Sequence, residues 1–263
     1  MARAKRHYIP EQIWHITHRC HRREFLLKFG KDCRRWVHWL FEAKKRYGLP
    51  ILNYAVTSNH IHLLVVGGED RDVISSSIRL VAGRTGQEYN QRKGRRGAFW
   101  EDRYHATAVE SGEHLLQCIV YIDLNMMRAD VVGHPSEWPF CGYSEIQEPK
   151  RRKALIDHDK LKELLGFDSH NEVKTYHERW VSEYIESSKN RRDDKWTKSI
   201  AVGSKGFVEE VKRLMGVSAI GRKRTEAGGA YQLREPSILY GEDFEAKKGD
   251  LRAENTYLWD INL

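Results

Sequence analysis

The chain has 263 residues, 40% of them hydrophobic, which is enough for one substantial core and a smaller appended unit. Its formal net charge of +8 favours a polyanionic partner. No apolar run approaches the ~18 residues that span a bilayer, and the N-terminus does not resemble a signal peptide. The four cysteines are scattered without a Cys-x-x-Cys pair, which argues against a zinc knuckle or a disulfide framework. We therefore expect a cytoplasmic protein with no membrane association.

The first half of the sequence alternates between strand formers and amphipathic helices. In chain order we expect a strand over 12–20, a helix over 32–47, a strand over 51–57, a further strand up to 66, a helix over 72–91 and a strand over 103–109. The order βαββαβ predicts an α+β fold, a ferredoxin-like antiparallel sheet with helices on one face. A helix over 112–131 would then close over the opposite face.

One strand carries a histidine pair in the run Thr57-Ser-Asn-His60-Ile-His62-Leu-Leu-Val-Val66. Side chains of a strand alternate between its two faces, so His60 and His62 project together while Ile61 projects to the other side. Neutral imidazoles spaced in this way can hold one divalent metal ion. A pair of surface or hydrogen-bonded histidines is the alternative interpretation, because a His-x-His pair alone is a weak signal.

The helix expected over 112–131 has an apolar arc and a polar arc. Tyr121 lies on the polar arc with Asn125, four residues further on, and the two side chains are therefore expected on one face. This spacing lets the hydroxyl and the amide oxygen reach one common point. For Tyr121 alone, the alternative is a half-exposed tyrosine without a special role. The apolar arc comprises Leu115, Leu116, Ile119, Val120, Ile122, Met126 and Met127.

Three motifs carry a resemblance to a known family: Tyr54-Ala-Val-Thr-Ser-Asn-His60-Ile-His62-Leu-Leu-Val, then Phe99-Trp100-Glu-Asp-Arg103-Tyr104, then Tyr121-Ile-Asp-Leu-Asn125-Met-Met-Arg128-Ala129. Over residues 8–146 the chain closely resembles the single-tyrosine HUH transposases, and within them the REP-associated tyrosine transposase branch. Met126 stands where members of that branch usually have a proline. A proline sets a conformation and supplies no chemical group, so the resemblance still predicts an active enzyme.

The resemblance implies a metal-dependent single-stranded DNA endonuclease and strand transferase that acts near hairpin DNA. In that reaction Tyr121 attacks a backbone phosphorus, which forms a 5′-phosphotyrosine and frees a 3′-hydroxyl. His60, His62 and Asn125 would hold Mg²⁺ or Mn²⁺, since an N/N/O set with open positions suits these ions. Single-stranded or hairpin DNA would be the partner of a monomer or homodimer. The sequence contains no Gly-x-x-x-x-Gly-Lys-Ser/Thr motif, and we therefore expect no nucleotide cofactor.

A basic loop, residues 91–97, precedes the second of these motifs. Cations on a glycine-containing loop beside aromatic side chains can combine phosphate neutralisation with base stacking. The alternative is a solvated loop whose aromatic residues anchor the following strand. The DNA-binding residues predicted in this region are Arg92, Lys93, Arg95, Arg96, Trp100 and Arg103.

A proline and a run of charges near residue 149 predict a boundary between a transposase-like domain over 1–148 and a C-terminal extension over 149–263. The extension is expected to be mostly helical, and one interpretation gives it a DNA-binding role. The elements predicted in it are helices over 159–165, 171–187 and 207–215, a polar link over 188–194, a strand over 230–233 and a turn-rich tail.

Two other functions stay open on the same fold. One is a DNA-hairpin-binding or repressor protein without turnover, and the other is a metal-independent RNA-binding domain. The simultaneous presence of His60, His62, Tyr121 and Asn125 favours the enzyme, because binding alone does not require this set.

Overall fold

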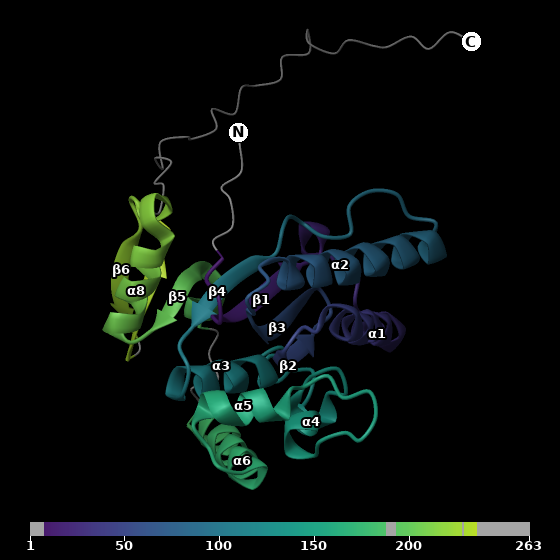
Figure 1. Cartoon of the computed structure of the whole chain (residues 1–263). Coiled ribbons are helices and arrows are strands. Elements are labelled where there is room, and N and C mark those ends of the chain that lie inside the picture. The colour runs from purple at the N-terminus through teal and green to yellow at the C-terminus, as the bar shows by residue number, and fades with distance from the viewer. Residues whose placement is uncertain (1–7, 188–192, 228, 236–263) are drawn as a thin grey trace, which may run out of the picture.

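The computed structural model describes residues 8–187, 193–227 and 229–235, and a seven-stranded sheet runs through its centre (Figure 1). Its first four strands lie in the order β2-β3-β1-β4 with antiparallel neighbours, which is the split arrangement that the predicted βαββαβ order produces. The predicted ferredoxin-like, α+β fold is therefore confirmed. These strands are β1 (Ile13–Arg19), β2 (Ile51–Val56), β3 (His60–Val66) and β4 (His105–Val109).

Helices cover both faces of this part of the sheet (Figure 1). α1 (Gly30–Tyr47) and α2 (Asp72–Lys93) pack on one face, and α3 (Glu113–Asp123) packs on the other. Strand alternation explains the two layers, because Trp14 and Ile16 of β1 belong to the core beneath α1 and α2 while Ile13 belongs to the core beneath α3. α1 stops at Gly48, whose φ of 68° is a left-handed cap that glycine adopts without a Cβ clash.

α3 is shorter than the predicted helix over 112–131, which is wrong at its C-terminal end. The helix ends at Asp123, and the chain continues in tight turns through residue 130. The Asp123 carboxylate is buried and accepts hydrogen bonds from Asn53 Nδ2 at 3.0 Å and from His177 Nε2 at 2.7 Å. These contacts hold the end of α3 against β2 and against a later helix, so the end of α3 depends on tertiary contacts that its own periodicity does not reveal.

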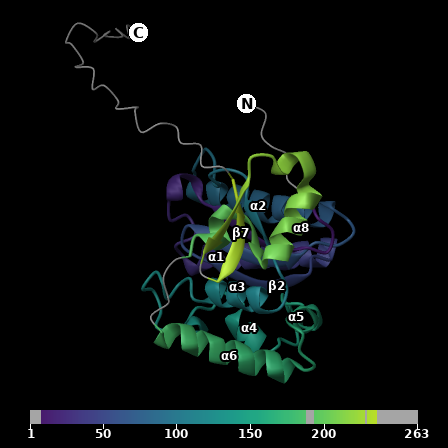
Figure 2. The same cartoon turned by 90° about the vertical axis from the view of Figure 1, so that its left-hand side faces the viewer.

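The C-terminal part of the chain extends the same sheet. β5 (Ser199–Gly203) pairs in parallel with β4, and the order continues through β7 (Ala230–Arg234, labelled in Figure 2) to β6 (Lys223–Ala227) at the edge (Figure 1). The strand predicted over 230–233 corresponds to β7, whereas β5 and β6 were not predicted. The helices of this part are α4 (Tyr143–Gln147), α5 (His158–Leu165), α6 (His170–Glu186), α7 (Lys195–Lys198) and α8 (Lys205–Met215), with single 3₁₀ turns at His21–Arg23, Pro135–Glu137 and Gly216–Ala219.

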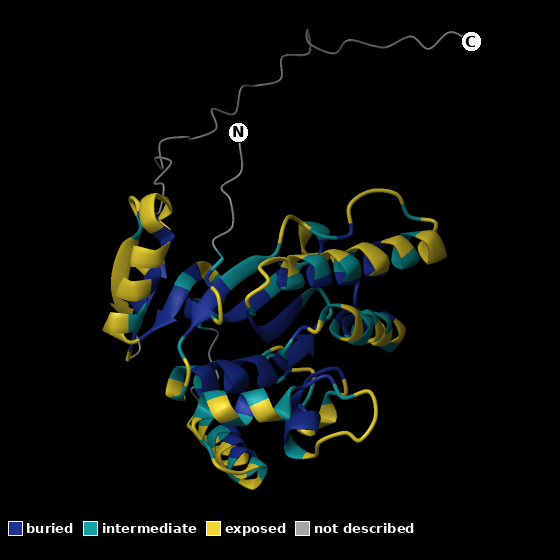
Figure 3. Ribbon diagram, in the orientation of Figure 1, coloured by how far each residue is buried: buried dark blue, intermediate teal, exposed yellow. Residues whose placement is uncertain are grey.

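α5 and α6 lie over the outer side of α3, so α3 forms a buried layer between the sheet and these two helices (Figures 1 and 3). The outer sides of α6 and α8 and the edge strand β6 are exposed, while the central strands and α3 are mostly buried (Figure 3). Most of the polar link predicted over 188–194 and all of the tail beyond residue 235 fall outside the described residues. No helix in the described ranges is both long and apolar enough to cross a membrane.

Candidate active site

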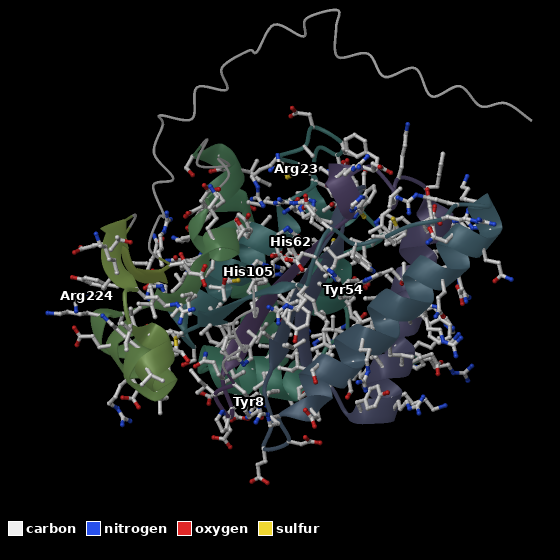
Figure 4. The ribbon with its side chains drawn as sticks, turned by 90° about the horizontal axis from the view of Figure 1, so that it is seen from above. Tyr8, Arg23, Tyr54, His62, His105 and Arg224 are labelled. Atoms are coloured by element: carbon white, nitrogen blue, oxygen red, sulfur yellow. The ribbon has the colours of Figure 1, made fainter. Side chains whose placement is uncertain are left out.

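The site is a cavity of about 590 Å³ between the histidine strand and the end of α3. Its walls include His60 and His62 of β3, Tyr121 of α3 and Asn125 in the turn that follows α3. Arg23 and His105 also line it, from the loop after β1 and from β4 (Figure 4, where both are labelled with His62). The structure thus brings to one cavity all four residues predicted as nucleophile and metal ligands.

The distances among these side chains are short. The rings of His60 and His62 have centroids 4.9 Å apart, and the ring of His62 lies 5.8 Å from that of Tyr121. Asn125 Nδ2 lies 2.8 Å from His62 Nε2, within hydrogen-bond distance. Although Tyr121 and Asn125 do not share one continuous helix as predicted, Tyr121 near the end of α3 and Asn125 in the following turn both lie beside His62.

Tyr121 is buried, with 6% of its surface exposed, so the alternative of a half-exposed tyrosine is wrong. The sequence pattern missed this because the rings beside Tyr121 belong to His15, His62 and Trp196, which are distant in the chain. The guanidinium of Arg128 stacks over the Tyr121 ring at 4.3 Å from its centroid and donates to the Tyr121 backbone carbonyl. This places a positive charge beside the residue that was predicted as the nucleophile.

Asn59 fixes the orientation of the His60 ring. Its Nδ2 donates to the backbone carbonyl of Arg23 at 3.2 Å, so its Oδ1 is the atom that lies 2.7 Å from His60 Nδ1. A carbonyl oxygen can only accept, and His60 Nδ1 must therefore carry the proton. Nε2 of His60, when the ring is neutral, then carries a lone pair and no proton. No signal other than its place directly before His60 pointed to Asn59.

His15 of β1 stands behind His62. Its Nε2 lies 2.9 Å from His62 Nδ1, and its Nδ1 lies 2.9 Å from the backbone carbonyl of Trp196. His15 is fully buried, and burial lowers its pKa to about 3, so the ring is neutral. The Trp196 ring in turn lies 6.2 Å from that of Tyr121. Sequence reasoning missed both residues. The available signal for His15 was its place between Trp14 and Ile16 in a predicted strand, the same alternation that singled out the histidine pair.

Arginines from several elements line the cavity. Arg19 lies at the end of β1 and Arg23 in the following 3₁₀ turn, while Arg103 precedes β4 and Arg128 follows α3. Among the predicted DNA-binding residues, Arg103 is the one found in the cavity wall. Arg23 has a φ of 59°, in the left-handed region that residues other than glycine rarely adopt and that costs on the order of 1 kcal/mol. The loop therefore keeps Arg23 in a strained conformation beside the site.

The basic loop (residues 91–97) lies outside the cavity wall, and some of its cations have partners in the protein. Arg92 forms an ion pair with the buried carboxylate of Asp32, and Arg95 lies 3.6 Å from the carboxylate of Glu24. The ammonium group of Lys93 lies over the ring of Phe29, 5.5 Å from its centroid. For Arg92 and Arg95 the structure thus supplies a role in holding the loop, and their DNA contacts stay a prediction.

Phe99 and Trp100 are packed inside the fold. Phe99 is 4% exposed and contacts the ring of Tyr89, with centroids 5.1 Å apart. Trp100 stacks on His18 with centroids 4.2 Å apart, and its indole N–H donates to the Ala82 carbonyl at 3.0 Å. This matches the alternative in which the aromatic residues anchor the following strand, and a role of Trp100 in DNA binding stays untested.

Comparison with known proteins finds a family similar to the part of the chain that holds most of this cavity. Residues 9–125 match the family described as "Transposase IS200 like", which confirms the resemblance inferred from the motifs. No curated protein matches the chain. One similar solved structure is described as a REP-associated tyrosine transposase bound to a REP hairpin, with 22% identity, a TM-score of 0.46, and coverage of 55% of this chain and 84% of that one. Another is a putative transposase from Deinococcus radiodurans R1, with 15% identity, a TM-score of 0.33, and coverage of 49% and 98%.

The ion pair between Arg92 and Asp32 gives a pH-dependent prediction. Burial raises the pKa of Asp32 and Arg92 opposes that rise, so Arg92→Gln should raise the pKa of Asp32 further above its unfolded value. A carboxyl whose pKa is higher in the folded state is stabilising at low pH, and that contribution is lost as the pH rises through the folded-state pKa. The variant should therefore lose about 1–3 kcal/mol of unfolding free energy at pH 7 and less at pH 4, measured by urea denaturation.

Arg96→Gln is the matched control in the same loop, because no ion pair of Arg96 is found within the described part of the chain. Its unfolding free energy should stay within about 0.5 kcal/mol of the unmodified protein at both pH values. Equal losses for Arg92→Gln at pH 4 and pH 7 would contradict an electrostatic contribution of this ion pair to stability.

Proposed function

From the match of residues 9–125 to the IS200-like transposase family, we propose that this chain cleaves and rejoins single-stranded DNA through a covalent bond to Tyr121. The family supports a transposase-like enzyme that processes DNA. The observation that carries the finer proposal is the position of Tyr121, whose ring lies 5.8 Å from that of His62 in an arginine-lined cavity. A tyrosine used only for packing would not require a histidine pair and four guanidinium groups around it.

In the proposed reaction the Tyr121 oxygen attacks a phosphodiester phosphorus, and the bond from that phosphorus to the 3′ oxygen breaks. The products are a 5′-phosphotyrosine and a strand that ends in a 3′-hydroxyl, which receives the phenolic proton in the net reaction. Attack by a 3′-hydroxyl on the phosphotyrosine reverses the step and joins two strands. One phosphate ester replaces another each time, so the cycle requires no ATP. Arg128, stacked on the Tyr121 ring, would stabilise the negative charge on the attacking oxygen.

The residues around Tyr121 fit a hard divalent ion. Bound Mg²⁺ or Mn²⁺ would neutralise charge on the phosphoryl oxygens in the transition state. His60 and His62 would hold the ion through Nε2, because Nδ1 of each ring already has a partner, Asn59 or His15. Asn125 would be the third ligand after rotation of its amide, since its Nδ2 now faces His62.

The affinity of this site for the ion should depend on the DNA. Among the residues that the structure describes, no cluster of three His, Cys, Asp or Glu side chains is arranged to hold a metal. Two histidines and one amide leave several coordination positions for phosphate oxygens and water. We therefore infer weak binding of the ion by the protein alone and tighter binding when a phosphate is in the cavity.

The charges of the cavity favour a nucleic-acid strand as substrate. Arg19, Arg23 and Arg103 surround the histidine pair and can contact phosphates on either side of the scissile one. The acidic residues Glu101 and Asp102 also line the cavity, and Glu101 lies 3.9 Å from Arg19. With neutral histidines, the four arginines exceed the two acids, which leaves an excess of positive charge for a polyanion.

Tyr121→Phe tests the nucleophile. The substitution keeps the ring and its packing and removes only the hydroxyl, so DNA affinity and folding should persist while cleavage and the protein–DNA adduct disappear. The assay incubates the protein with a pool of single-stranded hairpin DNAs and Mn²⁺, resolves adducts on a denaturing gel and locates the nucleotide remnant by mass spectrometry.

Tyr104→Phe is the matched control, since Tyr104 lies just before β4 and outside the wall of this cavity. It should form the adduct at the rate of the unmodified protein. A remnant on a peptide without Tyr121 would refute the assignment. Binding without any adduct in the unmodified protein would instead favour a non-catalytic hairpin-binding protein.

Removal of the metal or of its ligands should separate chemistry from binding. His60→Ala or His62→Ala, or addition of a chelator, should abolish adduct formation while DNA affinity changes little, because most phosphate contacts are assigned to the arginines. Asn125→Ala should reduce activity less than loss of either histidine, since water can replace an amide oxygen. The measurements are adduct yield as a function of Mn²⁺ concentration and DNA affinity by fluorescence anisotropy. Full activity in excess chelator would exclude the metal.

The cavity arginines should dominate the salt dependence of DNA binding. For a single strand, each cation that no longer neutralises a phosphate lowers the slope of log affinity against log salt by ~0.7. Arg23→Gln combined with Arg103→Gln should therefore lower the slope by up to ~1.4, measured by anisotropy titrations at several salt concentrations. The double variant Lys93→Gln, Arg96→Gln removes the same charge from the basic loop. It should lower the slope of log affinity against log salt by a smaller amount. If the double variant in the basic loop lowers the slope more than the double variant in the cavity, the basic loop is the main phosphate-binding surface.

A further inference from the structure

A short segment far outside the family-matched residues is tied to the candidate active site. It comprises α7 and the start of β5, residues 195–199, and three side chains of the N-terminal half bind its backbone carbonyls. His15 Nδ1 lies 2.9 Å from the Trp196 carbonyl, and Thr107 Oγ1 donates to the Ser199 carbonyl at 2.6 Å. His105 Nε2 lies 3.0 Å from the same Ser199 carbonyl. β1 and β4 thus fix the position of this segment through the buried side chains of His15 and Thr107 and the half-buried side chain of His105.

The contact with Trp196 determines where the protons of two histidines lie. A backbone carbonyl can only accept, so Nδ1 of His15 carries a proton and donates it. His15 is fully buried, with no carboxylate among its hydrogen-bond partners, and its ring is neutral. Nε2 of His15 is then an acceptor, and the 2.9 Å contact requires His62 Nδ1 to be the donor. Nε2 of neutral His62 therefore has a lone pair and no proton.

The tautomer assigned to His62 matches its other contact. Asn125 Nδ2 lies 2.8 Å from His62 Nε2, and an amide N–H requires an acceptor there. In free neutral histidine the proton favours Nε2, which would place a hydrogen where a metal ion or a donor must approach. The hydrogen bond to His15 reverses this preference at His62, as Asn59 does at His60.

We propose that His15 is a positioning residue for His62, and that the Trp196 carbonyl, through His15, keeps the Nε2 lone pair of His62 directed into the cavity. The inference rests on the proposed function and deepens it, since it names the groups that orient one ligand of the same site. It also gives residues beyond the family-matched segment a part in that site. Partners of this kind typically change metal affinity by 10–100-fold when removed.

Three substitutions of His15 separate the two contacts. The amide of Gln extends to about the place of Nε2 and can accept from His62, whereas the amide of Asn reaches only the place of Nδ1 and can still donate to Trp196. Leu has a similar volume and can form neither hydrogen bond. If His15 acts through His62, the Gln variant should resemble the unmodified protein, and the Asn and Leu variants should both be impaired.

The direct measurement is the tautomer of His62 in the metal-free full-length protein, observed by ¹⁵N NMR of the histidine rings. Signals of His62 are identified by their loss in His62→Gln. The unmodified protein and His15→Gln should show a proton on Nδ1, while His15→Asn and His15→Leu should show a shift towards Nε2. Mn²⁺ affinity with a bound oligonucleotide should weaken roughly 10–100-fold in the last two variants.

Ile16→Val controls for lost stability, because Ile16 is buried on the same strand but faces the opposite core. It should lower the melting temperature and leave the tautomer and Mn²⁺ affinity unchanged. Retention of the Nδ1 proton and of Mn²⁺ affinity in a folded His15→Leu would overturn the proposal. Normal behaviour of His15→Asn with impairment of His15→Gln would show that His15 only anchors residues 195–199.

The NMR readout also separates this inference from the proposed function. If His62 carries its proton on Nδ1 in a protein that never forms an adduct with DNA, the cleavage reaction is refuted and the positioning role remains. An adduct that forms normally with His62 in the Nε2-protonated state would refute the positioning role and leave the cleavage reaction intact.

Discussion

The alternation of side chains along the central strands is the constraint on which both the core and the site depend. Each strand is buried on its two faces, so every second side chain must suit α1 and α2 and the others must suit α3. Trp14 and Ile16 lie on the face that packs against α1 and α2. His15, His62 and His105 lie on the face toward α3, beside Tyr121. A shift of one residue in register would bury the histidines among apolar side chains, and the fold therefore specifies the site as strongly as it specifies the core.

Most of the first half could be predicted from sequence because its signals are local. Periodicities of two and 3.6 residues gave the order of elements, and the motifs gave the histidine pair and Tyr121. β6 was missed because its five residues, Lys223–Ala227, have no apolar alternation and lie at the sheet edge. The end of α3 was missed because distant residues, Asn53 and His177, bind Asp123. Contacts of this kind leave no trace in a short window of sequence.

The site shows the same division between local and distant information. Residue type and spacing identified the candidate ligands, but neither could show that His15 lies behind His62 or that a carbonyl of Trp196 lies behind His15. Charge is equally ambiguous in sequence. Arg92 and Arg103 appear as similar cations in one stretch, yet Arg92 pairs with a buried carboxylate while Arg103 lines the cavity. The difference depends on Asp32, sixty residues away from Arg92.

The parallel pairing of β4 with β5 has a consequence for folding during translation. Translation delivers the histidine pair, Tyr121 and the four N-terminal strands before it delivers Trp196 and β5. At roughly 5–20 residues per second, a ribosome needs several seconds to make the intervening chain. During that interval the nascent polypeptide holds the residues assigned to cutting DNA but lacks the carbonyl that orients His15. The hydrogen bonds that orient His15 and His62 can therefore be complete only after residues 195–199 have been made.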